Sequence, residues 1–206
     1  MLAVDAPALE NSTGGTASRM KKAIFLDRDG TLIQEVGYLR MLEDLRFTPR
    51  AAEALQTFAN LGYLNIVITN QSAVARGLLS PKALNKIHLK LKTMAKEEDA
   101  TIHDIFFCPH FPEGRVPPYN IECSCRKPKT GMLEQAVAKH HIDLQQSILI
   151  GDKICDLELG KNAGLRTILV LTGYGAQTKE EWTEAVESHR NLYEFSKSLV
   201  AEERLV

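Results

Sequence analysis

Residues 23–31 read Ala-Ile-Phe-Leu-Asp-Arg-Asp-Gly-Thr, four apolar residues followed directly by a carboxylate. A short, uninterrupted apolar run of this kind is typical of a strand buried on both faces of a parallel sheet. Further short runs begin near Tyr63, Asp104, Ser147 and Thr167, and most are separated by segments with helical spacing. This alternation predicts an α/β fold, with a Rossmann-like parallel sheet and helices on both of its faces.

Helix signals occur between these runs. Residues 49–61 begin with Pro49 and are followed by Gly62, and Ser80-Pro81 supplies an N-cap and first turn for a helix to about residue 98. Shorter helices are expected over 131–140 and 156–163. The C-terminal stretch predicts a further helix that packs back on the sheet, from residues near helical spacing: Trp182, Val186, Leu192, Phe195 and Leu199.

The composition is that of an ordinary globular chain. It has 206 residues, 44% of them hydrophobic, and a net charge of −1 from 25 Lys and Arg against 26 Asp and Glu. This balance offers no electrostatic basis for binding nucleic acid or an anionic membrane. No stretch approaches the ~18 apolar residues of a membrane-spanning helix, and the first residues lack the apolar segment of a signal peptide. We therefore expect a cytoplasmic monomer whose partner is a small molecule.

The chain is expected to contain one folded domain. Residues 1–20 are rich in Ala, Ser, Thr and Gly and show neither a strand nor a helix period, which predicts a disordered leader. Residues 21–206 show no internal repeat, and no insertion of cap-domain length follows residue 31. We interpret 21–206 as a single domain without a large cap.

Charged and hydroxyl side chains gather at the ends of the predicted strands and in the loop before the fourth of them. In open parallel sheets, ligands bind beyond the carboxyl ends of the strands, so these side chains are expected to converge. The carboxylates, the hydroxyl and the cations concerned are Asp27, Asp29 and Asp152; Thr69; and Arg126, Lys127 and Lys153. A carboxylate can attack phosphorus to form an aspartyl-phosphate, and clustered carboxylates require a hard cation such as Mg²⁺. The set favours phosphoryl transfer.

Four motifs, in this order, resemble those of the haloacid dehalogenase superfamily of phosphatases: Asp27-x-Asp29-Gly30-Thr31-Leu32, Thr69-Asn70, Lys127, and Gly151-Asp152-Lys153-x-x-Asp156. The resemblance implies that Asp27 is the nucleophile and that Asp29 is the general acid and later the general base. It implies that Thr69 and Lys127 bind the transferring phosphoryl group. It also implies that Asp27, the backbone carbonyl of Asp29, and Asp152 hold Mg²⁺. Asp156, the second acidic residue of the last motif, is expected to hold these catalytic and metal-binding residues in place without binding the metal itself.

A second cluster lies in a proline-rich loop. Cys108-x-His110 and Cys123-x-Cys125, twelve residues apart, offer three thiolates and one imidazole. Four protein ligands of these types suit a tetrahedral, structural Zn²⁺. The alternative is that Cys108 is a buried strand residue and the other two cysteines are free thiols. Because Arg126 and Lys127 follow Cys125 directly, zinc at this place would hold two cations against a phosphate.

The loop resembles the zinc-containing branch of the superfamily, which includes heptose bisphosphate phosphatases and histidinol-phosphate phosphatases. The twelve-residue gap resembles the longer zinc loop of the heptose enzymes. The resemblance implies a sugar bisphosphate as substrate, with histidinol phosphate or another small sugar phosphate as the alternative. Residues expected to bind the substrate are Glu35, Val36, Gly37, Tyr38, Asn70, Gln71, Ser72, Arg126 and Lys153.

Two other classes of protein share some of these features. A phospho-acceptor receiver domain combines a β/α sheet with carboxylates, a hydroxyl and a lysine, but its acidic pair precedes the phosphorylated aspartate, whereas here Asp27 and Asp29 close the first strand. A non-catalytic zinc adaptor would account for Cys108, His110, Cys123 and Cys125 but leaves the strand-end residues without a role. We therefore favour a Mg²⁺-dependent phosphatase.

Overall fold

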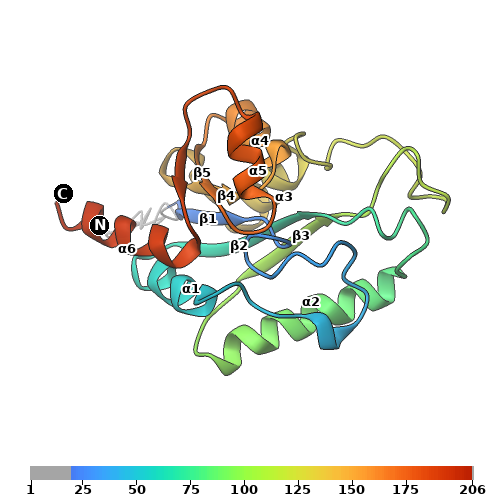
Figure 1. Cartoon of the computed structure of the whole chain (residues 1–206), viewed down its shortest axis with the longest axis horizontal. Helices are drawn as coiled ribbons and strands as arrows, with labels where there is room; N and C mark the ends of the chain where they lie inside the picture. The colour runs from blue at the N-terminus through green and yellow to red at the C-terminus, as the bar shows by residue number, and fades with distance from the viewer. Residues whose placement is uncertain (1–19, 206) are drawn as a thin grey trace, which may run out of the picture.

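A computed structural model describes residues 20–205 of the chain. The predicted leader, apart from Met20, lies outside these residues. Six strands form one parallel sheet in the order β3-β2-β1-β4-β5-β6 (Figure 1). Their bounds are β1 Ala23–Leu26, β2 Leu64–Asn70, β3 Asp104–Cys108, β4 Ile148–Gly151, β5 Arg166–Val170 and β6 Glu187–His189. The predicted Rossmann-like sheet is confirmed.

Strand β1 shows why the sheet is buried on both faces. All four of its residues are buried, and successive side chains point to opposite sides. Ile24 and Leu26 belong to a cluster with α1 (Ala51–Asn60), α2 (Pro81–Glu97) and α6 (Leu192–Glu203). Ala23 and Phe25 belong to a cluster with α3 (Gly131–His140) and α4 (Ile154–Ala163). The sheet therefore lies between two helical layers (Figure 1).

Most predicted helix ends agree with the structure. Ser80 caps α2 as expected, since its side chain accepts a hydrogen bond from the backbone N–H of Ala83. Helix α4 begins at Ile154, two residues before the predicted start. The reason is a capping interaction, because Asp156 Oδ2 accepts a hydrogen bond from the backbone N–H of Lys153 at 3.1 Å.

The C-terminal region differs from the prediction. Instead of one helix from Trp182 onward, the chain forms α5 (Gly175–Glu181), the edge strand β6 and then α6. Trp182 ends α5 and Val186 precedes β6, so only Leu192, Phe195 and Leu199 share the buried face of a helix. Strand β6 is the short polar sequence Glu-Ser-His and carries no apolar run, which is why the sequence did not predict it.

Sheet topology determines where a site can form. The chain moves from β1 outward to β3 and then returns to β4 on the other side of β1. The loops that leave β1 and β4 therefore diverge and open a crevice at the carboxyl end of the sheet. Residues 109–130 add a long loop without helix or strand near this edge. Across residues 20–205, no helix has the length and apolar character needed to cross a membrane.

Candidate functional site

A cavity of about 210 Å³ lies at the carboxyl end of the sheet. Most predicted site residues line it, and Asp152 lies buried beside it. Among the residues predicted to bind substrate, Val36 is the exception, because it is 45% exposed and does not line the cavity. The predicted residues that line the cavity are Asp27, Asp29, Glu35, Gly37, Tyr38, Thr69, Asn70, Gln71, Ser72, Arg126, Lys127 and Lys153.

The Lys127 ammonium joins two buried carboxylates. Its Nζ lies 2.8 Å from Asp27 Oδ1 and 2.6 Å from Asp156 Oδ1, and it also donates to the carbonyl oxygen of Ile68 at 3.0 Å. Burial opposes ionisation of Asp27, but the charges of Lys127 and Lys153 outweigh it and lower its pKa. At Lys127, burial opposes the charge, but the carboxylates of Asp156 and Asp27 outweigh it and raise the pKa of the ammonium. Asp27 is thus a carboxylate and Lys127 is a cation.

Asp152 lacks a comparable cationic partner. Its side-chain oxygens accept hydrogen bonds from Thr31 Oγ1 at 3.0 Å and from the backbone N–H of Tyr174 at 2.9 Å, both neutral donors. Burial and the charge of Asp27 raise the pKa of Asp152 to about 8. Carboxylate oxygens of Asp27, Asp152 and Asp156 lie within 4.8 Å of one another. A divalent cation beside Asp27 and Asp152 would supply the missing positive charge, so these residues fit Mg²⁺.

The backbone around Gly30 allows this close approach. Gly30 has φ +89°, and a Cβ at this position would collide with the Asp152 carboxylate. The backbone carbonyl of Asp29, the third predicted magnesium ligand, accepts a hydrogen bond from Lys153 Nζ at 3.3 Å. This carbonyl oxygen therefore already faces a positively charged group, the Lys153 ammonium.

The Asp29 carboxylate is held by two neighbours. Arg28 Nη2 lies 2.9 Å from Asp29 Oδ1, and Gln71 Nε2 donates to Asp29 Oδ2 at 2.8 Å. Gln71 Nε2 also donates to Thr69 Oγ1 at 2.8 Å. The end of β2 and the end of β1 are therefore joined through side chains that face the cavity.

Asn70 connects β2 to the proline-rich loop. Its amide nitrogen donates to the carbonyl oxygen of Lys127 at 3.1 Å, and its amide oxygen accepts from the backbone N–H of Lys127 at 3.0 Å. Two bonds to one residue fix the backbone of Lys127 against the sheet. Asn70 lines the cavity as predicted, but both ends of its amide group are used in this contact.

The segment that follows the first motif, residues 35–38, is joined to the site by an ion pair. Glu35 Oε2 lies 2.8 Å from Lys153 Nζ, and Glu35 Oε1 accepts from the backbone N–H of Gly37 at 2.7 Å. Tyr38, which is 45% exposed, lies at the cavity mouth. This short segment borders the cavity in place of a large cap.

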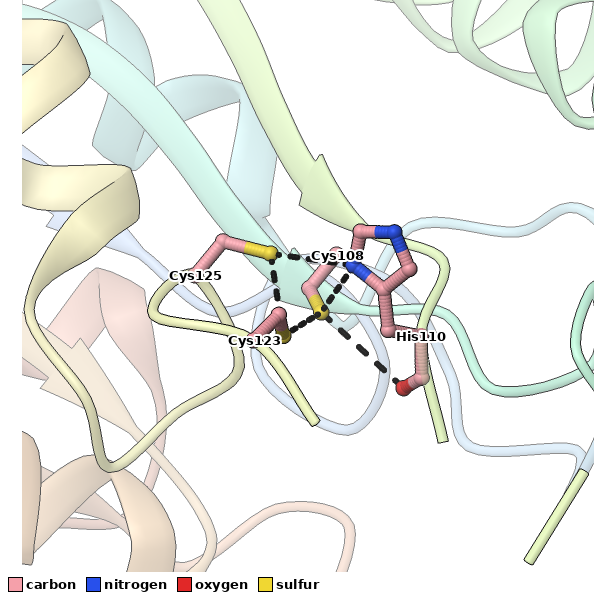
Figure 2. A group of neighbouring side chains, drawn as sticks. All are labelled: Cys108, His110, Cys123 and Cys125. Atoms are coloured by element: carbon pink, nitrogen blue, oxygen red, sulfur yellow. Dashed lines mark hydrogen bonds between the residues drawn. The ribbon is translucent and has the colours of Figure 1, made fainter. Parts of the chain in front are cut away.

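The four predicted zinc ligands lie together in space (Figure 2). The Sγ atoms of Cys108 and Cys123 are 3.5 Å apart, those of Cys123 and Cys125 are 3.3 Å apart, and His110 Nδ1 is 3.4 Å from Cys125 Sγ. Metal–sulfur bonds of ~2.3 Å in a tetrahedron give edges of about 3.8 Å. None of the four cysteines of the chain forms a disulfide. The cluster fits a zinc ion, and Cys155 lies outside it.

The Cys/His cluster adjoins the cations of the same loop that line the cavity. Arg126 Nη1 donates to the carbonyl oxygen of His110 at 3.2 Å, so this cation is held by a ligand residue as well as by its neighbour Cys125. Its guanidinium lies 5.2 Å from the ring centroid of Phe111. Holding the loop together therefore also holds Arg126 at the cavity.

Three residues were given no catalytic role from the sequence but contribute to the site. Arg28 is buried and lines the cavity, and its place between the two aspartates after a buried strand is the sequence signal for this position. His88 lies on the buried face of α2 that also carries Leu84 and Leu91, a helical spacing that could have singled it out in the sequence. Cys155 lines the cavity from the first turn of α4, where burial raises its pKa to about 12.

Comparisons with known proteins agree with this geometry. A family model described as HAD-hydrolase-like matches residues 124–194. The chain is 44% identical over 177 residues to D-glycero-alpha-D-manno-heptose-1,7-bisphosphate 7-phosphatase of Photorhabdus laumondii, covering 85% of this chain and 95% of that protein. It is 41% identical over 155 residues to the beta-anomer enzyme of Haemophilus ducreyi, covering 74% and 85%.

A solved structure of a phosphatase has a similar fold. The D,D-heptose 1,7-bisphosphate phosphatase of B. bronchiseptica, in complex with magnesium and phosphate, superposes with a TM-score of 0.79 at 29% identity. The superposition covers 88% of this chain and 99% of that one. The similarity thus extends over nearly all of the described residues.

Proposed function

Because the chain belongs to the heptose-1,7-bisphosphate 7-phosphatase family of the haloacid dehalogenase superfamily, we propose that it removes the 7-phosphate of D-glycero-D-manno-heptose 1,7-bisphosphate through an aspartyl-phosphate on Asp27. Members of this family are sugar-bisphosphate phosphatases. The observation that carries the proposal is the contact of Asp27 with Lys127 beside Asp152, at the carboxyl edge of the sheet.

In the first half-reaction, the Asp27 carboxylate attacks phosphorus while the bond between phosphorus and the sugar O7 breaks. Lys127 holds Asp27 Oδ1 and prevents free rotation of the nucleophile. Asp29 donates its proton to the departing alkoxide. Thr69 and Lys127 bind the equatorial phosphoryl oxygens, where negative charge is spread in the transition state.

In the second half-reaction, Asp29 is ionised and takes a proton from water. The water oxygen attacks phosphorus, the bond to Asp27 breaks, and inorganic phosphate leaves. The proton taken from water restores Asp29 for the next cycle. One carboxylate thus serves as acid and then as base, which requires its position to be the same in both steps.

Two metals are part of the proposal. Mg²⁺, held by Asp27, Asp152 and the carbonyl of Asp29, would offset the charge of the nucleophile and of the bound phosphate. Zn²⁺, held by Cys108, His110, Cys123 and Cys125, would fix the loop that carries Arg126 and Lys127. Strand β2 carries Thr69, and Asn70 adds two hydrogen bonds to the backbone of Lys127, so β2 and the zinc loop would place Lys127 together.

Substrate choice is assigned to short segments at the cavity mouth. Glu35, Gly37, Tyr38, Ser72, Arg126 and Lys153 line the small cavity, which suits a polar sugar bisphosphate. Residues 21–206 are proposed to form a single domain, active as a monomer in the cytoplasm. The product would enter synthesis of ADP-heptose for lipopolysaccharide core or S-layer glycan.

Phosphate release from purified protein tests this function. Both anomers of heptose 1,7-bisphosphate, histidinol phosphate and simple sugar monophosphates are offered with Mg²⁺. We expect one heptose anomer to give the highest kcat/KM, and Asp27→Asn to abolish turnover. Asp99→Asn, an exposed change at the end of α2, is the matched control. Normal turnover by Asp27→Asn would exclude the aspartyl-phosphate route, and preference for histidinol phosphate would reassign the substrate.

A further inference from the structure

The residue between the two proposed catalytic aspartates in the sequence is an arginine, Arg28, whose side chain is buried. The Arg28 side chain is only 1% exposed, although it is one of the largest polar side chains in the protein. A buried charge persists only where neighbours compensate it and satisfy its hydrogen-bond donors. The contacts of Arg28 therefore indicate what this costly placement achieves.

One edge of the guanidinium faces Asp29. Arg28 Nη2 and Nε both contact the Asp29 carboxylate, at 2.9 Å to Oδ1 and 3.1 Å to Oδ2 respectively. Nη2 also donates to Gln71 Oε1 at 2.8 Å, and Gln71 returns a bond from Nε2 to Asp29 Oδ2. Arg28, Asp29 and Gln71 form a closed ring of hydrogen bonds that leaves the carboxylate little freedom to rotate.

The other edge of the guanidinium faces helix α2. Arg28 Nη1 lies 3.1 Å from Nε2 of His88. Burial and the positive charge of Arg28 lower the pKa of His88 to about 3, so the ring is neutral and Nε2 is free to accept this bond. Phe107 of β3 packs against the His88 ring at a centroid distance of 5.2 Å. The histidine thus joins Arg28 to a rigid part of the fold.

We propose that Arg28 is the positioning residue for Asp29 and that His88, through its bond to Arg28 Nη1, holds Arg28 in the required orientation. This inference rests on the proposed function, since it assumes that Asp29 is the acid and base. It adds a chain of contacts from α2 to the reacting carboxylate. His88 itself does not line the cavity, so it acts through Arg28.

Two simpler roles are possible for these residues. The hydrogen bonds could serve only to satisfy a buried arginine, in which case losing one would lower stability and leave the chemistry unchanged. Alternatively, Arg28, which lines the cavity, could contact the substrate phosphate directly. In that case its displacement would raise KM more than it lowers kcat.

The experiment compares His88→Leu with His88→Gln, because glutamine retains an acceptor and leucine does not. p-Nitrophenyl phosphate is used as the substrate, since its leaving group departs without help from an acid. Impaired base action by Asp29 then leaves the first half-reaction fast and the second slow. We expect His88→Leu to give a burst of about one nitrophenolate per site, then a steady rate lower by on the order of tenfold. Its KM should change little and its melting temperature should fall, because Arg28 Nη1 loses its partner, whereas His88→Gln should recover most of the rate and of the stability.

Asp29→Asn provides the reference trace, with a burst followed by very slow turnover. If Asp29→Asn gives no burst, or Asp27→Asn turns over normally, the proposed function fails regardless of His88. If those variants behave as expected, three results would overturn the inference about Arg28 and His88. The first is that His88→Leu turns over at the wild-type rate. The second is that His88→Leu and His88→Gln lose activity to the same extent and also lose melting temperature to the same extent. The third is that His88→Leu changes only KM.

Discussion

The side-chain amide of Asn70 forms two hydrogen bonds with the backbone of a single residue, Lys127, donating at 3.1 Å and accepting at 3.0 Å. These residues are 57 positions apart in the chain. The contact attaches the proline-rich loop to the end of β2, and the Lys127 ammonium reaches Asp27 from there. A sheet strand thus positions a cation that belongs to a loop.

Replacing Asn70 tests this attachment. Asn70→Leu removes both hydrogen bonds and leaves the Lys127 backbone unpaired at the sheet edge. We expect kcat to fall by between ~10-fold and ~100-fold, because displacement of a catalytic group by about 1 Å has effects of this size. Steady-state phosphate release measures it. Asn60→Leu, an exposed substitution at the end of α1, should leave kcat unchanged. An unaltered rate in Asn70→Leu would show that Lys127 is positioned without Asn70.

Removing a zinc ligand should impair the reaction indirectly. Cys125→Ala breaks the cluster next to Arg126 and Lys127, so we expect loss of zinc and a fall in kcat of up to about 100-fold in protein that stays folded. Elemental analysis and circular dichroism accompany the assay. Cys155→Ala, outside the cluster, should keep one zinc per chain. Full activity in folded, zinc-free protein would contradict a positioning role for the zinc loop.

The stability of magnesium-free protein should depend on pH through Asp152. Its folded pKa is raised from 3.8 to about 8, so between these values the folded state holds a proton that the unfolded state has lost. The stabilising contribution of this group is therefore fully present below pH ~4 and is lost progressively as the pH rises towards ~8. Magnesium binding requires the ionised carboxylate, so its stabilising effect should grow as pH rises.

Thermal melting with and without MgCl₂ at several pH values measures this dependence. The buffer contains no metal chelator, so that the zinc site stays intact. Asp152→Asn serves as the control because it lacks the titrating carboxyl group. We expect the magnesium-dependent rise in melting temperature to increase with pH in the wild type and to disappear in Asp152→Asn. A rise of equal size at every pH would mean that Asp152 is already ionised in the folded protein.

The segment after the first motif offers a test of specificity. Tyr38 lines the cavity and Val36 does not, although both were predicted to bind substrate. We expect Tyr38→Ala to raise KM for the heptose bisphosphate several-fold, with little effect on p-nitrophenyl phosphate. Val36→Ala should leave both substrates unaffected, since a solvent-exposed methyl group contributes little. Equal effects of the two substitutions would assign the whole segment to substrate binding.

Much of the fold was predictable because its signals are local. The apolar run before Asp27, the Ser80-Pro81 cap and the apolar spacing of α2 are each contained in a few consecutive residues. Strand β6 was not predictable, because its polar residues form a strand only by pairing with the edge of β5. The first part of the predicted C-terminal helix, at Trp182 and Val186, was wrong for the same reason, because β6 follows it directly.

The sequence by itself determined the chemistry available to this protein: two aspartates after a buried strand, a third after β4, and three thiols with one imidazole at the end of β3 and in the loop that follows it. Only the tertiary structure decided how they are held. Lys127 lies between Asp27 and Asp156, Asn70 grips the Lys127 backbone, and His88 reaches Asp29 through Arg28. These contacts join residues far apart in the chain. Their partners are selected by burial and by the crossing of the sheet, which no local pattern records.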